Sequence, residues 1–289
     1  YGLGEAMYHL PMSTMVSEKT NEESLKLYMG SKTAINYAVR LVIPVVLGFF
    51  IDTGSFVQVA NVLLILSVLE LVLCAFLTPS RHRCKKPMDL IGFTKCMFRF
   101  PVIRHLFVME ICRGFSASML VTVITMYTVY MFQTDLNLGI LTTVCALFSI
   151  VSSWILGRYV QVRNYINVLK ICLIMLISGM TLFICHTAPI TFLIYNFEYA
   201  TGFVLLDQIG VFNMYRLSNS KCVTSNHRVE YLCFCETGLL LGRWASCIIL
   251  VYIGVFGGYD TLRWYLVSIL FTIIISGISS IRLLRNMRK

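Results

Sequence analysis

The stretch NYINVLKICLIMLISGMTLFIC, residues 164–185, decides the class of fold, because it carries a single charge, on Lys170. A bilayer core about 30 Å thick needs roughly 20 apolar residues in an α-helix, so this stretch predicts a membrane-spanning helix. The whole chain agrees, since 57% of its 289 residues are hydrophobic and 13% are charged. A soluble domain carries about 25% charged residues. This composition therefore excludes a water-soluble enzyme and a disordered chain.

Similar apolar runs recur along the sequence. We place eight of them, near residues 33–52, 56–78, 104–132, 137–157, 164–185, 190–215, 229–256 and 262–281. A β-barrel would show alternating segments of about ten residues instead. The sequence therefore predicts an all-α, polytopic membrane protein with eight transmembrane helices.

The polar gaps between the runs alternate between basic gaps and gaps poor in Lys and Arg, with Arg263 as the exception. Because basic loops stay in the cytoplasm, both termini are expected there, in a multi-pass protein of the plasma membrane. The same rule accounts for the net charge of +10 without a nucleic-acid partner. The longest basic gap separates two helices from six. Its segment 88–100 suits either a helix lying flat at the membrane interface or an ordinary cytoplasmic linker.

Several ionisable residues fall inside the predicted spans. A charge at the bilayer centre costs at least about 2.5–3.5 kcal/mol, so each one indicates either a functional site or a structural ion pair. These residues are Arg40, Glu70, Glu110, Arg113, Glu198, Asp207, Glu236 and Arg243.

Spacing suggests how some of these charges are arranged. Glu110 and Arg113 are three residues apart on one helix, a spacing that brings two side chains together. The pair would either face a water-filled cavity or join packed helices. Glu236 and Arg243 are two turns apart and share one side of their helix. Arg40 lies seven residues into its run and could snorkel to the interface only with difficulty, and Glu70 stands alone in 56–78.

Glu198 and Asp207 are nine residues apart and face opposite sides of a straight helix. They can line one cavity only if Gly202 lets the helix bend. Glu198 shares a face with Tyr195 and is our preferred cavity residue, while Asp207 is expected to pair with another helix. A carboxylate in such surroundings could carry a proton.

Signatures of other chemistries are absent from the sequence. There is no nucleotide-binding G-x-x-x-x-G-K-[ST], no G-x-S-x-G and no H-E-x-x-H. Cys233 and Cys235 point about 200° apart on a helix and cannot share a metal, and the other cysteines are scattered as small apolar residues. We therefore expect no enzyme, no cofactor and no metal, with transport energy drawn from an ion gradient or a partner chain.

Two local patterns bear on the family. The segment SWILGRYVQVR, residues 153–163, is similar to the G-x-x-x-D-R-x-G-R loop of the major facilitator superfamily, with Arg158 as the clean match. The spacing of Pro44 and Gly48 resembles part of the G-P-x-x-G-G motif of exporters in that superfamily, one position out of register. Together with the topology, these patterns make the chain resemble a major facilitator transporter.

The resemblance implies a division of the chain. Residues 1–78 correspond to the end of the N-terminal half, with Tyr1–Pro11 as the tail of its fourth helix, followed by its fifth and sixth. Residues 79–103 correspond to the central cytoplasmic loop, and residues 104–289 to the six-helix C-terminal half. Such a protein would carry about four further helices upstream, so we expect an N-terminally truncated member.

The resemblance also implies alternating access around a central cavity lined by the first, fourth, seventh and tenth helices. The last two correspond to 104–132 and 190–215, which favours Glu110, Arg113 and Glu198. The substrate or proton-coupling candidates are Glu110, Arg113, Glu198, Asp207 and Arg40. The gating or structural candidates are Arg158, Pro44, Gly48, Glu236 and Arg243.

Our hypothesis is a secondary active transporter of a small organic solute, proton-coupled, with a slight preference for efflux that rests on Pro44 and Gly48. Its partners would be the lipid bilayer, the solute and protons or another ion, and it would act as a monomer. The alternatives are a permease subunit of a multi-component transporter and an integral-membrane, lipid-modifying enzyme. The five histidines argue against the enzyme, because they are spread over both sides of the membrane.

Overall fold

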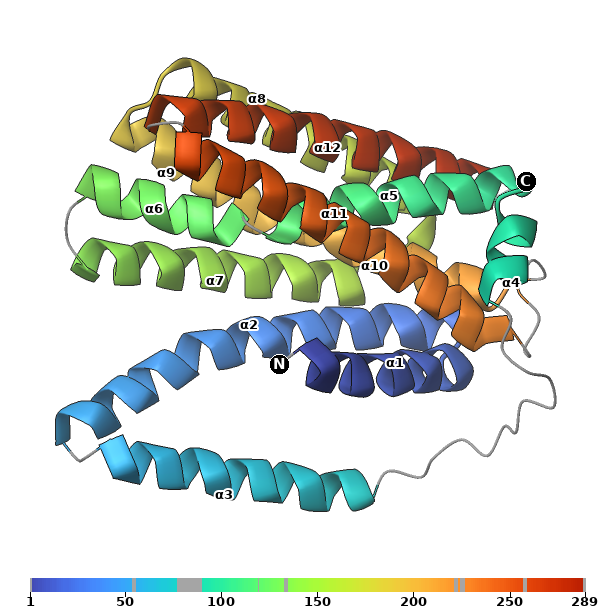
Figure 1. The fold of residues 1–289 in the computed structure, drawn as a ribbon, viewed down its shortest axis with the longest axis horizontal. Coiled ribbons are helices and arrows are strands. Elements are labelled where there is room, and N and C mark those ends of the chain that lie inside the picture. Colours follow the sequence, from blue (N-terminus) through green and yellow to red (C-terminus); the bar gives the residue numbers. More distant parts are fainter. Residues whose placement is uncertain are drawn as a thin grey trace.

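The protein is an all-helical bundle whose long helices run side by side (Figure 1). The computed structural model describes residues 2–53, 56–76, 90–118, 120–132, 135–220, 223, 227–256 and 259–287, and every regular element in those residues is helical. The all-α class predicted from composition is therefore confirmed for the described part of the chain.

The six apolar runs predicted after residue 104 all form helices. Within the described residues, six helical stretches are long and apolar enough to cross a membrane. They are built from α5 (Pro101–Ser118) with α6 (Leu120–Phe132), α7 (Asp135–Arg158), α8 (Tyr165–Cys185), α9 (Pro189–Glu198) with α10 (Val204–Ser218), α11 (Arg228–Phe256) and α12 (Tyr259–Asn286). Many large apolar side chains on their outer faces are exposed, as lipid contact requires.

The first two predicted spans correspond to α2 (Glu22–Thr53) and α3 (Phe56–Ala75). Within α3, the apolar part Ala60–Leu73 is shorter than the six long stretches, so a crossing by α2 and α3 stays a prediction. The helix before them, α1 (Gly2–Lys19), continues well past Pro11, where we had placed the end of a helical tail.

The start of α2 lies at Glu22 rather than at residue 33, because a polar segment extends the apolar run. Glu22 and Glu23 occupy its first turn, where negative charge is favoured by the helix dipole. The Ser24 hydroxyl accepts a hydrogen bond from the Asn21 backbone N–H at 2.8 Å, which satisfies one of the free donors at this end. The helix therefore begins outside the apolar run.

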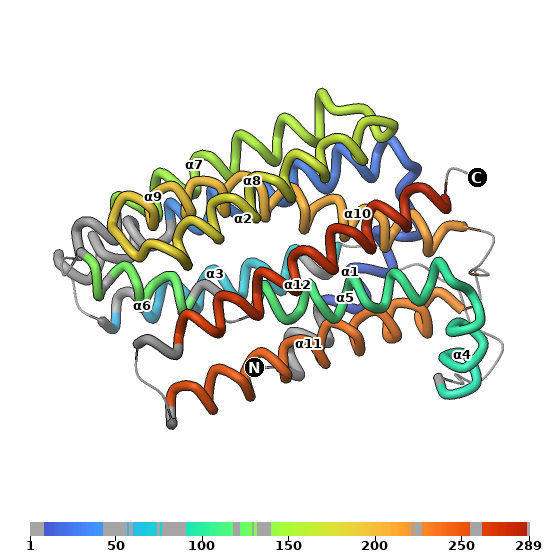
Figure 2. The backbone as a smooth tube through the Cα atoms, turned by 90° about the horizontal axis from the view of Figure 1, so that it is seen from above, coloured from blue at the N-terminus to red at the C-terminus, as the bar shows by residue number. Residues whose placement is uncertain are grey.

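The core forms where α5 crosses α11 and α12, with α8 and α10 on the other side. The crossing of α5 and α11 is close, because a Cβ added at Gly114 would overlap the Leu239 backbone and one at Gly242 would overlap that of Ile111. Figure 2 shows the same helices from above, with α5, α11 and α12 next to one another. This packing fixes the position of the α5 turn that carries Glu110 and Arg113.

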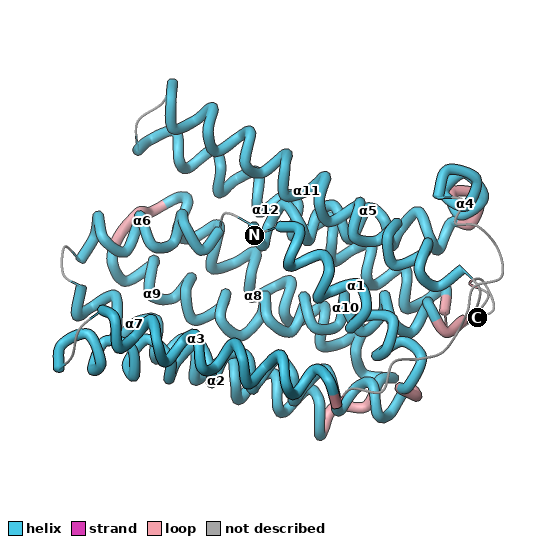
Figure 3. Tube along the Cα trace, turned by 60° about the horizontal axis from the view of Figure 1, so that its bottom comes forward, coloured by secondary structure: helices cyan, strands magenta, loops and turns pink. Residues whose placement is uncertain are grey.

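The first part of the chain contacts the six-helix unit mainly through α2 and α7. A Cβ on Gly30 would lie 2.6 Å from the Gly157 Cα, so the two backbones meet with no side chain between them. Figure 3 shows α2 and α7 running together along one side of the bundle. Two glycines far apart in sequence thus allow these helices to touch.

The short helix α4 (Leu90–Met97) lies at the same end of the bundle as the C-terminus, crosswise to the long helices (Figures 1 and 2). Phe93 and Met97 are buried, whereas Ile91 and Lys95 are exposed. The segment we placed at 88–100 is therefore helical and two-faced from Leu90 on. Its place at the membrane interface remains a prediction, and most of the preceding loop, residues 77–89, lies outside the described residues.

Candidate functional site

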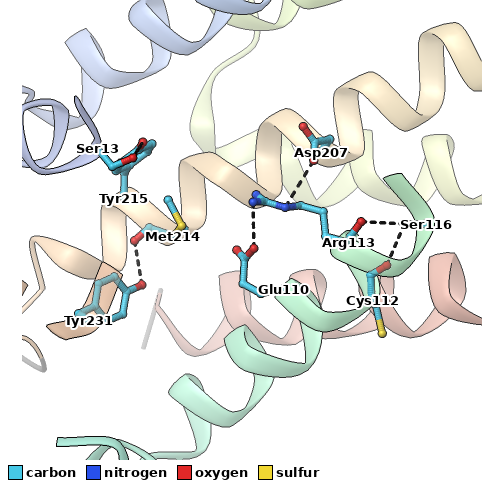
Figure 4. Close-up of polar contacts among 9 residues, drawn as sticks. All are labelled: Ser13, Glu110, Cys112, Arg113, Ser116, Asp207, Met214, Tyr215 and Tyr231. Carbon is cyan, nitrogen blue, oxygen red and sulfur yellow. Dashed lines mark hydrogen bonds and ion pairs between the residues drawn. The ribbon is translucent and has the colours of Figure 1, made fainter. Parts of the chain in front are cut away.

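Three charged side chains meet in the middle of the bundle (Figure 4). Glu110 and Arg113 come from α5, and Asp207 comes from α10. Arg113 Nη2 lies 3.0 Å from Glu110 Oε2, and Arg113 Nε lies 3.6 Å from Asp207 Oδ1. The structure thus confirms the pairing expected from the spacing of Glu110 and Arg113, and it gives Asp207 the partner expected on another helix.

These three residues, here called the charged triad, are unequally buried. Glu110 is 0% exposed and Arg113 is 9% exposed, whereas the Asp207 side chain is 42% exposed. Two carboxylates share one guanidinium, so the triad with both acids ionised has one negative charge in excess. A buried charge without a counter-ion is unfavourable, which makes the triad a natural place for a proton.

The chain between Asn196 and Asp207 is not a continuous α-helix. A π-helical turn, η2 (Tyr199–Phe203), separates α9 from α10, around the Gly202 where a bend was allowed. Glu198, just before this turn, lies against α8, where a Cβ on Gly179 would overlap its carboxylate. Asp207, beyond the turn, faces α5 instead.

Glu198 therefore does not share a cavity with Asp207. Tyr195, expected on the same cavity-facing stripe, is 1% exposed and stacks on Phe183 with ring centres 5.5 Å apart. Because Gly179 has no side chain, the Glu198 carboxylate fits against α8 at this position. The spacing of residues in the sequence does not reveal such a contact between two helices. A transport role for Glu198 stays a proposal.

A cavity of about 500 Å³ lies between the first part of the chain and the six-helix unit, and no member of the charged triad is among its lining residues. It is lined by residues of α2, α6, α7, α9, η2 and α10. Among the described lining residues Arg40 alone is charged. The uncharged polar residues of the lining are Tyr37, Thr125, Thr128, Thr142, Thr143, Ser149, Asn196 and Tyr199.

Sequence reasoning missed these uncharged residues, because a Thr, Tyr or Asn within an apolar run does not stand out. One signal was present, since Thr125 and Thr128, like Asn196 and Tyr199, are three residues apart and share a helix face. A search for polar pairs at helical spacing would have found both. Arg40 was identified from its charge, and the structure places it in the cavity.

The end of the bundle where α2 begins and α10 ends is tied together by polar contacts. Arg216 Nη2 lies 3.2 Å from Glu22 Oε1, and the hydroxyls of Ser17 and Ser218 are 2.6 Å apart. Figure 4 shows the Tyr215 hydroxyl beside Ser13, to which it donates a hydrogen bond of 3.0 Å. These contacts join α1 and α2 to α10, around a polar cavity of about 800 Å³.

The family model described as Major Facilitator Superfamily matches residues 1–222, about three quarters of the chain. The chain belongs to the major facilitator superfamily. Membership implies secondary transmembrane transport and not an enzyme. No curated protein matched the sequence.

Within this major facilitator protein, the segment that resembles the superfamily loop contacts α2. The Ser153 hydroxyl lies 3.3 Å from the Gly30 carbonyl and 2.8 Å from Gln208 Oε1, and Gly157 meets Gly30 directly. Arg158, the clean match, is exposed and stacks over Trp154 at 5.7 Å. The positions that depart from the superfamily pattern thus make the interhelical contacts.

The other gating or structural candidates lie on α2 and α11. Pro44 and Gly48 lie inside α2, where the structure describes the helical backbone and not their surroundings. Glu236 and Arg243 are exposed on α11 and form no ion pair among the described residues, although Glu236 acts electrostatically on both Glu110 and Arg113.

Proposed function

We propose that this major facilitator protein moves a small polar solute across the plasma membrane by alternating access, coupled to protons. The observation that carries the proposal is the position of the 500 Å³ cavity relative to the closed end, the end of the bundle where Arg216, Ser218 and Tyr215 make polar contacts. The cavity residues Leu141 and Thr142 lie near the start of α7, whereas the contacts of Ser218 and Arg216 lie at the far end of α10. Such an arrangement suits a state that is closed toward the cytoplasm.

The contacts at the closed end would have to break for the solute to leave on that side. They include two hydroxyl contacts and one partly exposed ion pair, and Leu25 and Leu217 are buried at the same end. An exposed ion pair contributes about 0–1 kcal/mol, so the ion pair adds little to the cost of opening. A polar cavity of about 800 Å³ lies around Glu22 and Arg216 at this end.

Proton coupling is assigned to the charged triad. Because Glu110 and Asp207 share one guanidinium, a proton on either carboxyl neutralises the group, and its release restores one negative charge. Asp207 is the more exposed acid and would exchange the proton, while Glu110 holds Arg113 in place. Efflux, the preference drawn from Pro44 and Gly48, remains part of the proposal.

The test uses purified protein in proteoliposomes, with a panel of labelled organic acids, sugars and amines and an imposed pH gradient. The double variant Ser17→Cys with Ser218→Cys should form a disulfide on oxidation, because the two hydroxyls touch. Flux of the transported solute should stop on oxidation and return with a thiol reductant, while Ser17→Cys alone stays active. Flux that survives the disulfide would overturn alternating access through this end.

The coupling is tested separately. Flux should depend on the pH gradient in the parent protein and lose that dependence in Asp207→Asn. The matched control is Glu23→Gln, which removes an exposed acid at the start of α2 that lies outside the lining of both cavities. Flux indifferent to the pH gradient in the parent protein would remove proton coupling and leave the transport proposal standing.

A further inference from the structure

We propose that the cavity takes a small organic anion and that Arg40 binds its carboxylate, phosphate or sulfonate group. This inference names the substrate class of the transport proposed above and rests on that function. It starts from a difference between two arginines, Arg40 and Arg113, of which one is neutralised by the protein and the other is not.

Arg113 is held from both sides by Glu110 and Asp207. Arg40 forms no ion pair among the described residues, and its guanidinium lies 6.0 Å from the ring centre of Tyr37, on the same helix face. Its side chain is exposed in the cavity. A guanidinium on an aromatic ring keeps its N–H fork available for a planar, two-oxygen acceptor.

Asp207 lies in the same region as Arg40 but does not act as its counter-ion. Asp207 and Arg40 both act electrostatically on Tyr37 and Tyr199, so they lie in the same region. The ion pair of Asp207, however, is with Arg113 at 3.6 Å. A cation this far along a helix of the bundle is costly without a counter-ion, and a bound anion supplies one.

The rest of the cavity lining indicates an organic anion and not a bare inorganic ion. Leu41, Ile124, Leu141 and Val204 form an apolar part of the lining, and the volume of about 500 Å³ is in the range of small-molecule sites. The Asn196 Nδ2 group donates to the Phe192 carbonyl at 2.8 Å, which leaves its amide oxygen as an acceptor. A ligand with an acidic head, a hydrocarbon body and a hydroxyl group would satisfy this lining.

The experiment compares acids with their uncharged amides by thermal unfolding of the purified full chain in detergent. The probes are benzoate with benzamide, hexanoate with hexanamide, and mandelate with mandelamide, each up to millimolar concentration. We expect at least one acid to raise the melting temperature in a saturable way, while its amide does not. Arg40→Gln should weaken that acid at least tenfold, and Arg40→Lys should weaken it less, because the charge remains.

The matched control is Arg104→Gln, an exposed arginine near the start of α5 that lies outside the cavity lining. It should bind the acid as the parent chain does. Ligand-free melting temperatures of both Arg40 variants show whether they fold. Amides that bind as well as acids, unchanged binding in a folded Arg40→Gln, or no binding by any acid of the panel would each overturn the inference.

The binding test fails independently of the transport test. Saturable acid binding that depends on Arg40, without flux in proteoliposomes, would support the anion site and contradict the transport function. Flux of an uncharged solute with no effect of Arg40→Gln would contradict the anion site and leave transport intact.

Discussion

Arg40 and Arg113 are both arginines inside apolar runs, and the sequence distinguishes them only by the acid that lies three residues before Arg113. The structure separates them, because Arg113 has two acidic neighbours and Arg40 has a tyrosine ring and a cavity. One arginine therefore holds two helices together, and the other is available to a ligand. The difference between the two arginines thus depends on the neighbours of each side chain and not on residue type.

Removing different members of the charged triad should affect stability unequally. Arg113→Gln leaves two carboxylates without their cation, and breaking a buried ion pair costs about 3–5 kcal/mol. Most of that loss comes from the buried Glu110, since solvent screens the half-exposed Asp207. Glu110→Gln leaves Arg113 balanced by Asp207 and should cost much less.

Thermal unfolding in detergent measures this order. Glu23→Gln removes a carboxylate from an exposed position at the start of α2 and is the control. We expect the melting temperature to fall most in Arg113→Gln, less in Glu110→Gln and least in Glu23→Gln. An Arg113→Gln variant as stable as the parent chain would contradict the triad.

The sequence predicts the triad in part. The spacing of Glu110 and Arg113 is enough to pair them, because both lie on one helix. It does not show that Asp207, nearly a hundred residues later, completes the group, since that depends on how α5 and α10 pack. Nor does it place the Glu198 carboxylate, whose position depends on the space left by Gly179.

At the scale of helices, apolar runs of about 20 residues were reliable indicators of where helices lie. The π turn of η2 was not predictable in detail, because nothing in the apolar run marks where it begins or ends. The contact of α2 with α7 was also hidden. It depends on Gly30 and Gly157, which are remote in sequence and uninformative until the helices are seen together.

The contact between Gly30 of α2 and Gly157 of α7 predicts how a larger residue would affect the packing of these two helices. Gly157→Ala places a Cβ 2.7 Å from the Gly30 Cα, so α2 and α7 must move apart, at a cost of about 1–3 kcal/mol. Gly254→Ala is the matched control, because a Cβ there has nothing within 4 Å. Alanine favours a helix over glycine by up to about 1 kcal/mol, so the control should be neutral or stabilising.

Melting temperatures of Gly157→Ala and Gly254→Ala test whether α2 and α7 are in backbone contact. A lower value for Gly157→Ala together with an unchanged or higher value for Gly254→Ala is the expected pattern. Equal shifts in both variants would mean that the helices are not in backbone contact.

At the scale of the whole molecule, the two ends of the bundle differ. Basic residues gather at the end that carries α4, the start of α2 and the end of α10, which the positive-inside rule predicts to be the cytoplasmic end. The turn between α8 and α9 lies at the opposite end (Figure 1). Native cysteines mark both ends, since Cys96 of α4 and Cys185 of α8 are exposed.

The orientation can be tested with those cysteines. A membrane-impermeant maleimide applied to intact cells should label Cys185, and Cys185→Ser should lose that label. Labelling of Cys96 should need inverted vesicles, with Cys96→Ser as its control. Reaction of both cysteines from the same side of the membrane would contradict the topology.

The π turn between α9 and α10 has one more consequence. A π turn contains one residue more than the α-helical repeat, so it offsets the angular phase of the two segments that it connects. Deleting a single residue from 199–203 would turn the second segment by about 100° and aim Asp207 away from α5. That one surplus amino acid allows the same helical segment to place Asn196 and Tyr199 in the cavity lining and Asp207 beside Arg113 of α5.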